Sequence, residues 1–147
     1  MKKPMPPTLF YTSIAVMLAL RWTLPIRRLL SFPWTLAGAG LLVAGLWVCV
    51  WADRVFREVG TTVKPFDEPG VLVTAGPFRV SRHPMYLGFV AALLGISVLL
   101  GAVSPFLVAL VFFLLTDRWY IAFEERAMRS KFGETYEQYR RKTRRWL

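Results

Sequence analysis

Two short polar segments, separated by a long apolar stretch, hold the residues of this sequence that are best suited to chemistry. The first, SRHPMY (81–86), contains the only histidine of the chain, between an arginine and a proline. The second, FEER (123–126), places two adjacent glutamates before an arginine. Guanidinium and imidazole groups donate hydrogen bonds, and carboxylates accept them from hydroxyl or ammonium groups. If the two segments meet, they predict a polar pocket that binds a small ligand.

The composition indicates where these segments lie. The chain has 147 residues, of which 55% are hydrophobic, and a formal net charge of +10. Residues 35–52 and 85–116 carry no charge, whereas lysine and arginine gather in 1–3, 54–82 and 118–145. A nucleic-acid-binding domain has no need of two uncharged stretches of this length. The pattern therefore favours a protein of the lipid bilayer over one that binds nucleic acid.

Four apolar segments predict an all-α integral membrane protein that forms a single domain. Each segment is close to the roughly 20 residues that a helix needs to cross the hydrocarbon core. Backbone groups in lipid must be hydrogen-bonded within their own segment, so helices are expected rather than isolated strands. The predicted transmembrane helices cover residues 8–24, 35–52, 84–102 and 105–123.

The basic residues predict the orientation of these helices. With four spans both termini lie on one side, and of 19 lysines and arginines only Arg21, Arg27 and Arg28 fall on the other. Positive charge is enriched on the cytoplasmic side of membrane proteins. We therefore expect a multi-pass protein of the inner (cytoplasmic) membrane with both termini in the cytoplasm. A loop at 53–83 and a tail at 124–147 lie on the same side.

The last two predicted spans bring the polar segments to one depth. Pro84 lies 19 residues before Val103, and Phe123 lies 20 residues after it, so the two arms of the hairpin have matching lengths. Proline suits the first position of a helix, and a helix N-terminus offers free N–H groups to an anion. Adjacent helical residues point about 100° apart, so only one of Glu124 and Glu125 is expected to point straight into a shared cavity.

These polar residues also have a purely structural interpretation. Arg82 and His83 can anchor a helix at the membrane interface, and the glutamates can pair with Arg126 or Arg129 on their own helix. We favour a functional site because the features coincide at one depth and His83 is the only histidine present.

The remaining segments yield further expectations. Residues 60–78 are punctuated by glycine and proline, which predicts a structured loop with one extended piece at 71–73. A break at Gly133 is expected to divide the tail into two helices. The basic run 140–145, with Trp146, is expected to lie against anionic headgroups. Close helix contact is predicted at three glycines of the second span, Gly38, Gly40 and Gly45. Three aromatic residues of the tail form a stripe that is expected to pack onto the protein or the headgroups, namely Phe132, Tyr136 and Tyr139.

The sequence LVTAGPFRVSRHPMYLG (72–88), followed by a helical hairpin and then by EER and KFGETYEQY (124–139), resembles the isoprenylcysteine carboxyl methyltransferase family. The related phosphatidylethanolamine N-methyltransferases share an H/N-P-M-Y-x-G element and a glutamate pair. The resemblance covers roughly residues 54–142. It implies an integral membrane enzyme that takes S-adenosylmethionine from the cytosol and a lipidic or prenylated acceptor from the bilayer. The cytoplasmic loop and the C-terminal helical segment would form the cofactor site.

The resemblance also implies roles for individual residues. The catalytic candidates are Arg82, Arg118 and Glu125. Arg118 is included because the family arginine that holds the substrate carboxylate, four residues before the first glutamate, is replaced here by Tyr120. The cofactor-binding candidates are Val71, Leu72, Val73, Phe78 (where the family commonly has tyrosine), His83, Pro84, Met85, Tyr86 and Glu124. No metal site is expected, because a single histidine and scattered glutamates give no convergent ligand set.

Several reactions stay open. The resemblance favours carboxyl O-methylation, which needs no base. N-methylation of a phospholipid amine would require a proton acceptor, for which Glu125 or His83 is the candidate. An NADPH-dependent reductase is disfavoured because the chain has no glycine-rich dinucleotide loop. A non-catalytic membrane protein such as a transporter is disfavoured because the second to fourth spans lack ionisable residues in their middle.

Overall fold

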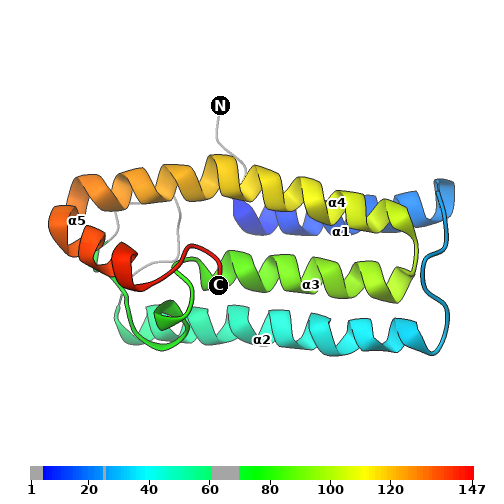
Figure 1. Ribbon diagram of the computed structural model, residues 1–147, viewed down its shortest axis with the longest axis horizontal. Helices are drawn as coiled ribbons and strands as arrows, with labels where there is room; N and C mark the ends of the chain where they lie inside the picture. Colours follow the sequence, from blue (N-terminus) through cyan, green and yellow to red (C-terminus); the bar gives the residue numbers. More distant parts are fainter. Residues whose placement is uncertain (1–4, 25, 61–69) are drawn as a thin grey trace.

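The computed structural model describes residues 5–24, 26–60 and 70–147, and the regular elements within them are helices, as predicted. Figure 1 shows these helices running side by side along an elongated bundle. The bundle consists of α1 (Pro6–Thr23), α2 (Ala37–Glu58), α3 (Pro84–Leu100) and α4 (Val103–Leu115). The α4 helix continues through a π-helical turn, η3 (Thr116–Ile121), into α5 (Ala122–Lys142). Short 3₁₀ turns lie before α2 (η1, Trp34–Leu36) and before α3 (η2, Gly76–Arg79).

Each predicted span coincides with a helix, but the helix ends differ from the predicted ones. α2 runs on to Glu58, so Arg54 and Arg57, which were expected in a loop, lie on its last turns. The Nε atom of Arg57 is 2.8 Å from Oδ2 of Asp53, an i,i+4 pair that stabilises helix beyond the apolar segment. Two helical segments, Trp34–Glu58 and Val103–Lys142, are long and apolar enough to cross a membrane, and α3 is a shorter apolar helix. Lys2, Lys3 and residues 61–69 of the predicted cytoplasmic loop lie outside the described residues.

The α2 and α3 helices pack with their backbones almost in contact. A Cβ atom added at Gly45 would lie 2.6 Å from the carbonyl oxygen of Gly88, and one at Gly95 would lie 2.7 Å from that of Gly38. Any side chain at these positions would push the two helices apart. The expectation of close contact is therefore confirmed for Gly38 and Gly45. It is wrong for Gly40, where an added Cβ would meet nothing within 4 Å.

Apolar side chains fill the core and also cover the outside. The core between α1, α3 and α4 is formed by Phe10, Met17, Ala92, Leu93, Ala109 and Phe112. Large apolar side chains on the outer faces of α2 and α4 are exposed, among them Val43, Trp47, Leu107, Val111 and Leu114. An apolar surface of this extent suits lipid rather than water.

Two connections meet at one end of the bundle. The N–H of Leu29 donates to the carbonyl of Gly101 at 2.8 Å, and the N–H of Val103 donates to the carbonyl of Arg27 at 3.0 Å. Gly101 ends α3 in the left-handed region (φ 63°), where glycine is favoured. The segment after α1 therefore lies against the tight turn between α3 and α4, as the predicted hairpin requires.

At the opposite end, α5 folds the chain back onto α3. It bends at Gly133 (φ 51°, ψ −121°), which confirms the predicted break. The N–H of Arg82 donates to the carbonyl of Arg144 at 3.0 Å, and Oγ of Ser81 donates to that of Arg145 at 3.1 Å. As a result, the C-terminal segment lies beside the start of α3 (Figure 1).

Two of the three aromatic residues of the predicted stripe, Tyr136 and Tyr139, pack onto the protein, the first of its two expected locations. Tyr136 is only 3% exposed. The hydroxyl of Tyr139 donates to the carbonyl of Phe78 at 2.6 Å, which ties α5 to η2. These contacts fix the fold-back of the chain above the polar segments.

Candidate active site

His83 lies between the two carboxylates of the glutamate pair. Its Nδ1 atom is 3.4 Å from Oε2 of Glu124, and its Nε2 atom is 3.6 Å from Oε1 of Glu125. Of the two glutamates only Glu125 lines the cavity described below, as expected, but both contact the imidazole. The two ring nitrogens point in different directions, and the glutamate side chains are long enough to converge on them from adjacent helical positions.

The backbone around His83 explains its position. Its N–H donates to Oγ of Ser81 at 3.2 Å, and its carbonyl accepts from the N–H of Leu87 at 3.1 Å. Pro84 occupies the first helical position of α3, as predicted, where a proline fits without loss of a hydrogen bond. The imidazole is therefore buried and held at the very start of the helix.

Tyr86 completes the surroundings of Glu124. Its hydroxyl donates to Oε1 of Glu124 at 2.5 Å, so this carboxylate contacts the tyrosine through one oxygen and His83 through the other. The ring of Tyr120 lies 6.5 Å from that of Tyr86, and both are buried in one cluster with Ile121. Tyr120 thus forms part of an apolar wall at the position where the resembled family has an arginine.

Glu125 is the centre of an ionic network. Nη2 of Arg82 lies 2.9 Å from its Oε1 atom. Arg145 binds both carboxylate oxygens, with Nε at 3.2 Å from Oε1 and Nη2 at 2.6 Å from Oε2. Asp117 in turn accepts from Nη1 of Arg145 at 3.2 Å and from the indole N–H of Trp146 at 2.9 Å.

This network corrects two expectations. Arg145 and Trp146 turn inward to acidic side chains instead of lying against headgroups, and the Trp146 ring lies 4.8 Å from that of Phe113 in a tilted arrangement. The alternative of local pairing with the glutamates is also wrong. Arg126 donates to the carbonyl of Ala122 at 3.1 Å, and Arg129 pairs with Glu137 at 2.6 Å.

The surrounding charges determine the protonation of the site. Burial alone would raise the pKa of Glu125, but hydrogen bonds from His83 and Arg145 and the charge of Arg82 lower it to about 2. Burial alone would lower the pKa of His83, but Glu124 and Glu125 together raise it above its ordinary value. Glu125 is therefore a carboxylate and a poor base, and the two glutamates stabilise the protonated form of His83 relative to a free imidazole.

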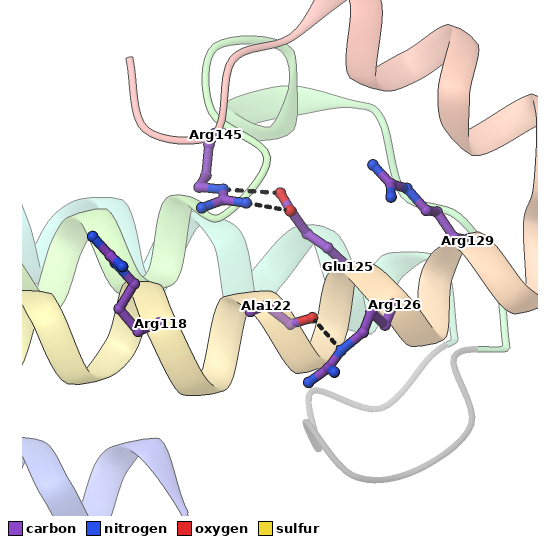
Figure 2. A pocket seen from close by; sticks show the side chains of 6 residues that line it. All are labelled: Arg118, Ala122, Glu125, Arg126, Arg129 and Arg145. Carbon is purple, nitrogen blue, oxygen red and sulfur yellow. Dashed lines mark hydrogen bonds and ion pairs between the residues drawn. The ribbon is translucent and has the colours of Figure 1, made fainter.

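An open hollow of about 400 Å³ lies beside this network (Figure 2). Figure 2 shows Arg145 bonded directly to Glu125, with Arg118 on the helix below. The side chain of Arg118 is 78% exposed, and its Nε atom is 3.8 Å from Oδ2 of Asp117. The hollow is lined by Arg118, Ala122, Glu125, Arg126, Arg129 and Arg145. Four guanidinium groups around one carboxylate make it attractive to an anion.

Several buried donors have no hydrogen-bond partner among the described residues. They include Nε and Nη1 of Arg82 and the hydroxyl of Tyr136. Buried polar groups in proteins are nearly always hydrogen-bonded. These donors can therefore bind an oxygen atom of a ligand or of water.

The predicted cofactor residues form a polar and an apolar group. His83, Tyr86 and Glu124 contact one another as described above. The apolar members Val73, Phe78 and Met85 pack with Ala52, Val55 and Phe56 of α2. Leu72 is partly buried and Val71 is exposed at the edge, and residues 72–74 are irregular.

Sequence reasoning missed Asp117, Arg145 and Trp146. Asp117 carried a usable signal, because it is the first charged residue after the uncharged stretch 85–116. Arg145 is one of several arginines in the tail, and nothing in its spacing distinguishes it from Arg144, whose side chain is exposed.

Comparison with known proteins supports the same region. A family model described as phospholipid methyltransferase matches residues 33–135, which include both polar segments. Protein-S-isoprenylcysteine O-methyltransferase of Schizosaccharomyces pombe is 41% identical over 96 residues, which are 63% of this chain and 39% of that protein. An uncharacterized protein of Haemophilus influenzae is 40% identical over 63 residues, which are 43% of this chain and 100% of that protein. No solved structure matches the chain.

The chain belongs to the phospholipid methyltransferase family, whose model matches well over half of it. The predicted likeness to isoprenylcysteine methyltransferases is confirmed by the Schizosaccharomyces pombe relative, of whose length the chain spans 39%. Family membership and the two helices of spanning length identify a membrane protein.

Proposed function

We propose that the chain is an S-adenosylmethionine-dependent methyltransferase that methylates the carboxylate of a lipidic or prenylated acceptor. The family supports methyl transfer, and the name of the Schizosaccharomyces pombe relative specifies O-methylation of an isoprenylcysteine. The observation that carries the choice of a carboxylate is that both candidate bases are already in ionic contact, Glu125 with Arg82 and Arg145 and His83 with the two glutamates.

A carboxylate attacks a methyl donor without losing a proton, whereas an ammonium group must first be deprotonated. Both candidate bases are unsuited to that step. Arg82 and Arg145 pair with Glu125 and hold its pKa at about 2, and the glutamates raise the pKa of His83. The charge pattern therefore favours O-methylation over N-methylation of a phospholipid amine, which the description of the family keeps as the second candidate.

The residues around His83 have the chemistry to hold the cofactor. S-adenosylmethionine, when bound, supplies a methyl group on a sulfonium centre that is already activated for displacement. The Glu124 carboxylate would accept from its ammonium or ribose hydroxyl groups, and the buried Nε and Nη1 atoms of Arg82 would donate to a carboxylate. The apolar cluster of Val73, Phe78 and Met85 would exclude water, with Val71 and Leu72 at its edge. The protein then mainly aligns the two reactants.

The arginine-lined hollow is the proposed site of the acceptor headgroup. Arg118 lies in η3, between α4 and the Glu pair, and its exposed guanidinium can bind a carboxylate. The preceding turns of the same helix expose Leu107, Val111 and Leu114, which would contact lipid. An acceptor could keep its hydrocarbon chain in the bilayer and place its carboxylate beside Arg118.

We also propose a four-span arrangement in the inner membrane with both termini in the cytoplasm. At one end of the bundle lie Arg27 and Arg28, and at the other lie Arg82 and the charged residues of α5. The larger group of basic residues favours the cytoplasmic side. Single cysteines introduced at Arg28 and Arg141 in a variant with Cys49→Ala would test this. A membrane-impermeant maleimide should label intact cells at residue 28 and not at residue 141.

Cofactor binding is the first test of the proposed activity. Purified protein in detergent should bind S-adenosylmethionine in calorimetry and should not bind NADPH. His83→Ala and Glu124→Ala should each weaken binding of S-adenosylmethionine by about tenfold or more, since each removes a group of the proposed site. Binding of NADPH alone would instead support the reductase, and binding of neither would support a non-catalytic role.

The acceptor group can be identified by the stability of the transferred methyl group. Membranes are incubated with the enzyme and methyl-labelled cofactor, and the extracted lipids are treated with alkali. A carboxyl methyl ester is hydrolysed and releases volatile labelled methanol, whereas an N-methyl group stays with the lipid. Retention of the label after alkali would favour phospholipid amine N-methylation.

A further inference from the structure

We propose that Arg145 is a positioning residue of the active site, which holds the Glu125 carboxylate in place and thereby orients Arg82 and His83. This inference rests on the proposed function, because it assigns the C-terminal segment 143–147 to the same site. Nothing in the family resemblance assigned a role to this segment.

Arg145 has the geometry of a clamp. It binds both oxygens of Glu125, at 3.2 and 2.6 Å, with two different guanidinium nitrogens. A two-point contact of this kind fixes the plane of a carboxylate, which a single contact cannot do. A third nitrogen, Nη1, donates to Asp117 at 3.2 Å. Arg145 is thus held by one acidic residue while it orients another.

The C-terminal segment is itself anchored on both sides. The carbonyls of Arg144 and Arg145 accept from the N–H of Arg82 and from Oγ of Ser81, which precede α3. The indole of Trp146 donates to Asp117 at 2.9 Å and contacts the ring of Phe113 of α4. The segment therefore connects the start of α3 to η3 and α5, the three elements that carry the site.

The Glu125 carboxylate in turn fixes the positions of Arg82 and His83. Its Oε1 atom contacts Nη2 of Arg82 at 2.9 Å and Nε2 of His83 at 3.6 Å, so a carboxylate that rotates away releases both. Without Arg145, the carboxylate also loses two charged hydrogen-bond donors, and its pKa should rise. The charged and titratable groups that face it are Arg82 and His83 before α3, Tyr136 and Arg129 on α5, Arg118 and Arg126 across the hollow, and Arg145.

The experiment compares Arg145→Ala and Arg145→Lys with the control Arg144→Ala, whose side chain is exposed. Methyl transfer is measured against pH, and affinity for S-adenosylmethionine is measured by calorimetry. We expect Arg145→Ala to lower kcat/KM by roughly tenfold to 100-fold, the range seen for residues that orient the ligands of a metal site. The acid limb of its pH profile should move to higher pH. Arg145→Lys should recover part of the loss through its charge, and Arg144→Ala should stay within about twofold of wild type.

A double-mutant cycle separates positioning from a general loss of structure. If Arg145 acts through Glu125, Arg145→Ala should have little further effect in a Glu125→Gln background, both on kcat/KM and on the pH dependence of the thermal midpoint in detergent. Equal losses in both backgrounds would overturn the inference. The thermal readout tests it even without turnover, whereas failure of wild-type protein to bind S-adenosylmethionine would count against the proposed function alone.

Discussion

The two ends of the helical bundle are joined in different ways. At the end that carries Arg27 and Gly101, the connections are held by backbone hydrogen bonds, such as that from Val103 to Arg27. At the other end, one backbone hydrogen bond, from Arg82 to Arg144, is joined by charged side chains, with the buried Glu125 between the buried Arg82 and the partly exposed Arg145. A backbone hydrogen bond depends little on side-chain identity, whereas a buried charge needs a partner of opposite sign.

This difference indicates which end is built for stability and which for function. Burying ion pairs is a poor way to gain stability, because the desolvation of both partners offsets much of their attraction. A fold that needed only to close the bundle could use backbone contacts at both ends. The concentration of Arg82, His83, Glu124 and Glu125 at one end is therefore better explained by ligand binding than by packing.

The largest loss of stability is expected when Glu125, the centre of the ionic network at the end of the bundle that carries Arg82, is removed; we call this end the charged end. Glu125→Ala leaves the Arg82 side chain, which is 7% exposed, without its ion-pair partner. Loss of one partner of a buried pair typically costs about 3–5 kcal/mol. Arg27→Ala at the other end retains the backbone hydrogen bond and should change the free energy of unfolding by less than about 0.5 kcal/mol. Chemical unfolding in detergent measures both, and similar losses would contradict the contrast.

The next largest loss of stability is expected at the opposite end of the bundle, where backbone hydrogen bonds hold the connections around Gly101. In Gly101→Ala the residue keeps φ near 63°, and its Cβ would lie 2.5 Å from the carbonyl oxygen of Leu30. The left-handed conformation alone costs about 1–2 kcal/mol, and the clash adds to it. Gly60→Ala is the matched control, because Gly60 has φ 70° but an added Cβ meets nothing within 4 Å. We expect the thermal midpoint to fall further for Gly101→Ala than for Gly60→Ala.

The dependence of stability on pH should separate the charged end from the rest. The pKa of Glu125 lies below its ordinary value, at about 2, so its contribution is fully present above the unfolded-state pKa and is lost as pH falls toward 2. The pKa of His83 is raised, so its contribution is present at low pH and lost as pH rises through the folded-state pKa. The stability difference between wild type and Glu125→Gln should therefore shrink between about pH 4.5 and 2. A constant difference would show that Glu125 does not titrate as the structure indicates.

The smallest effect on stability is expected for a substitution of Arg118, which lines the open hollow beside Glu125. The Arg118 side chain is 78% exposed, so Arg118→Ala should change the free energy of unfolding by less than about 0.5 kcal/mol. If Arg118 binds the acceptor carboxylate, KM for the acceptor should rise by about tenfold, equivalent to about 1.4 kcal/mol, while cofactor affinity stays constant. Arg141→Ala, on the exposed tail, is the control and should leave KM unchanged.

The arrangement of the helices could be predicted because its causes are local. Apolar length defined the spans, Pro84 marked the start of α3, and equal arm lengths brought SRHPMY and FEER to one end. The prediction of α2 stopped too early because it followed hydrophobicity alone, whereas the Asp53–Arg57 pair extends the helix into polar sequence.

The details of the site could not be predicted in the same way. Contact between Arg145 and Glu125 joins residues that lie 20 apart on either side of the bend at Gly133, and no periodicity signals such a contact. The convergence of both glutamates on one imidazole depends on side-chain conformations, which a helical wheel does not contain. The assignments of cofactor and catalytic roles stay predictions until binding is measured.

The π-helical turn η3 has a consequence for how this site can change. A π-helical turn closes its hydrogen bonds one residue later than an α-helix does, so deleting a single residue from Thr116–Ile121 can restore α-helical winding. Such a deletion would leave the side chains downstream close to their present direction. Deleting one residue from an ordinary α-helical turn would instead rotate everything downstream by about 100° and aim the carboxylates at another neighbour. The candidate site should therefore tolerate the loss of a residue within η3 better than a loss within α4 or α5.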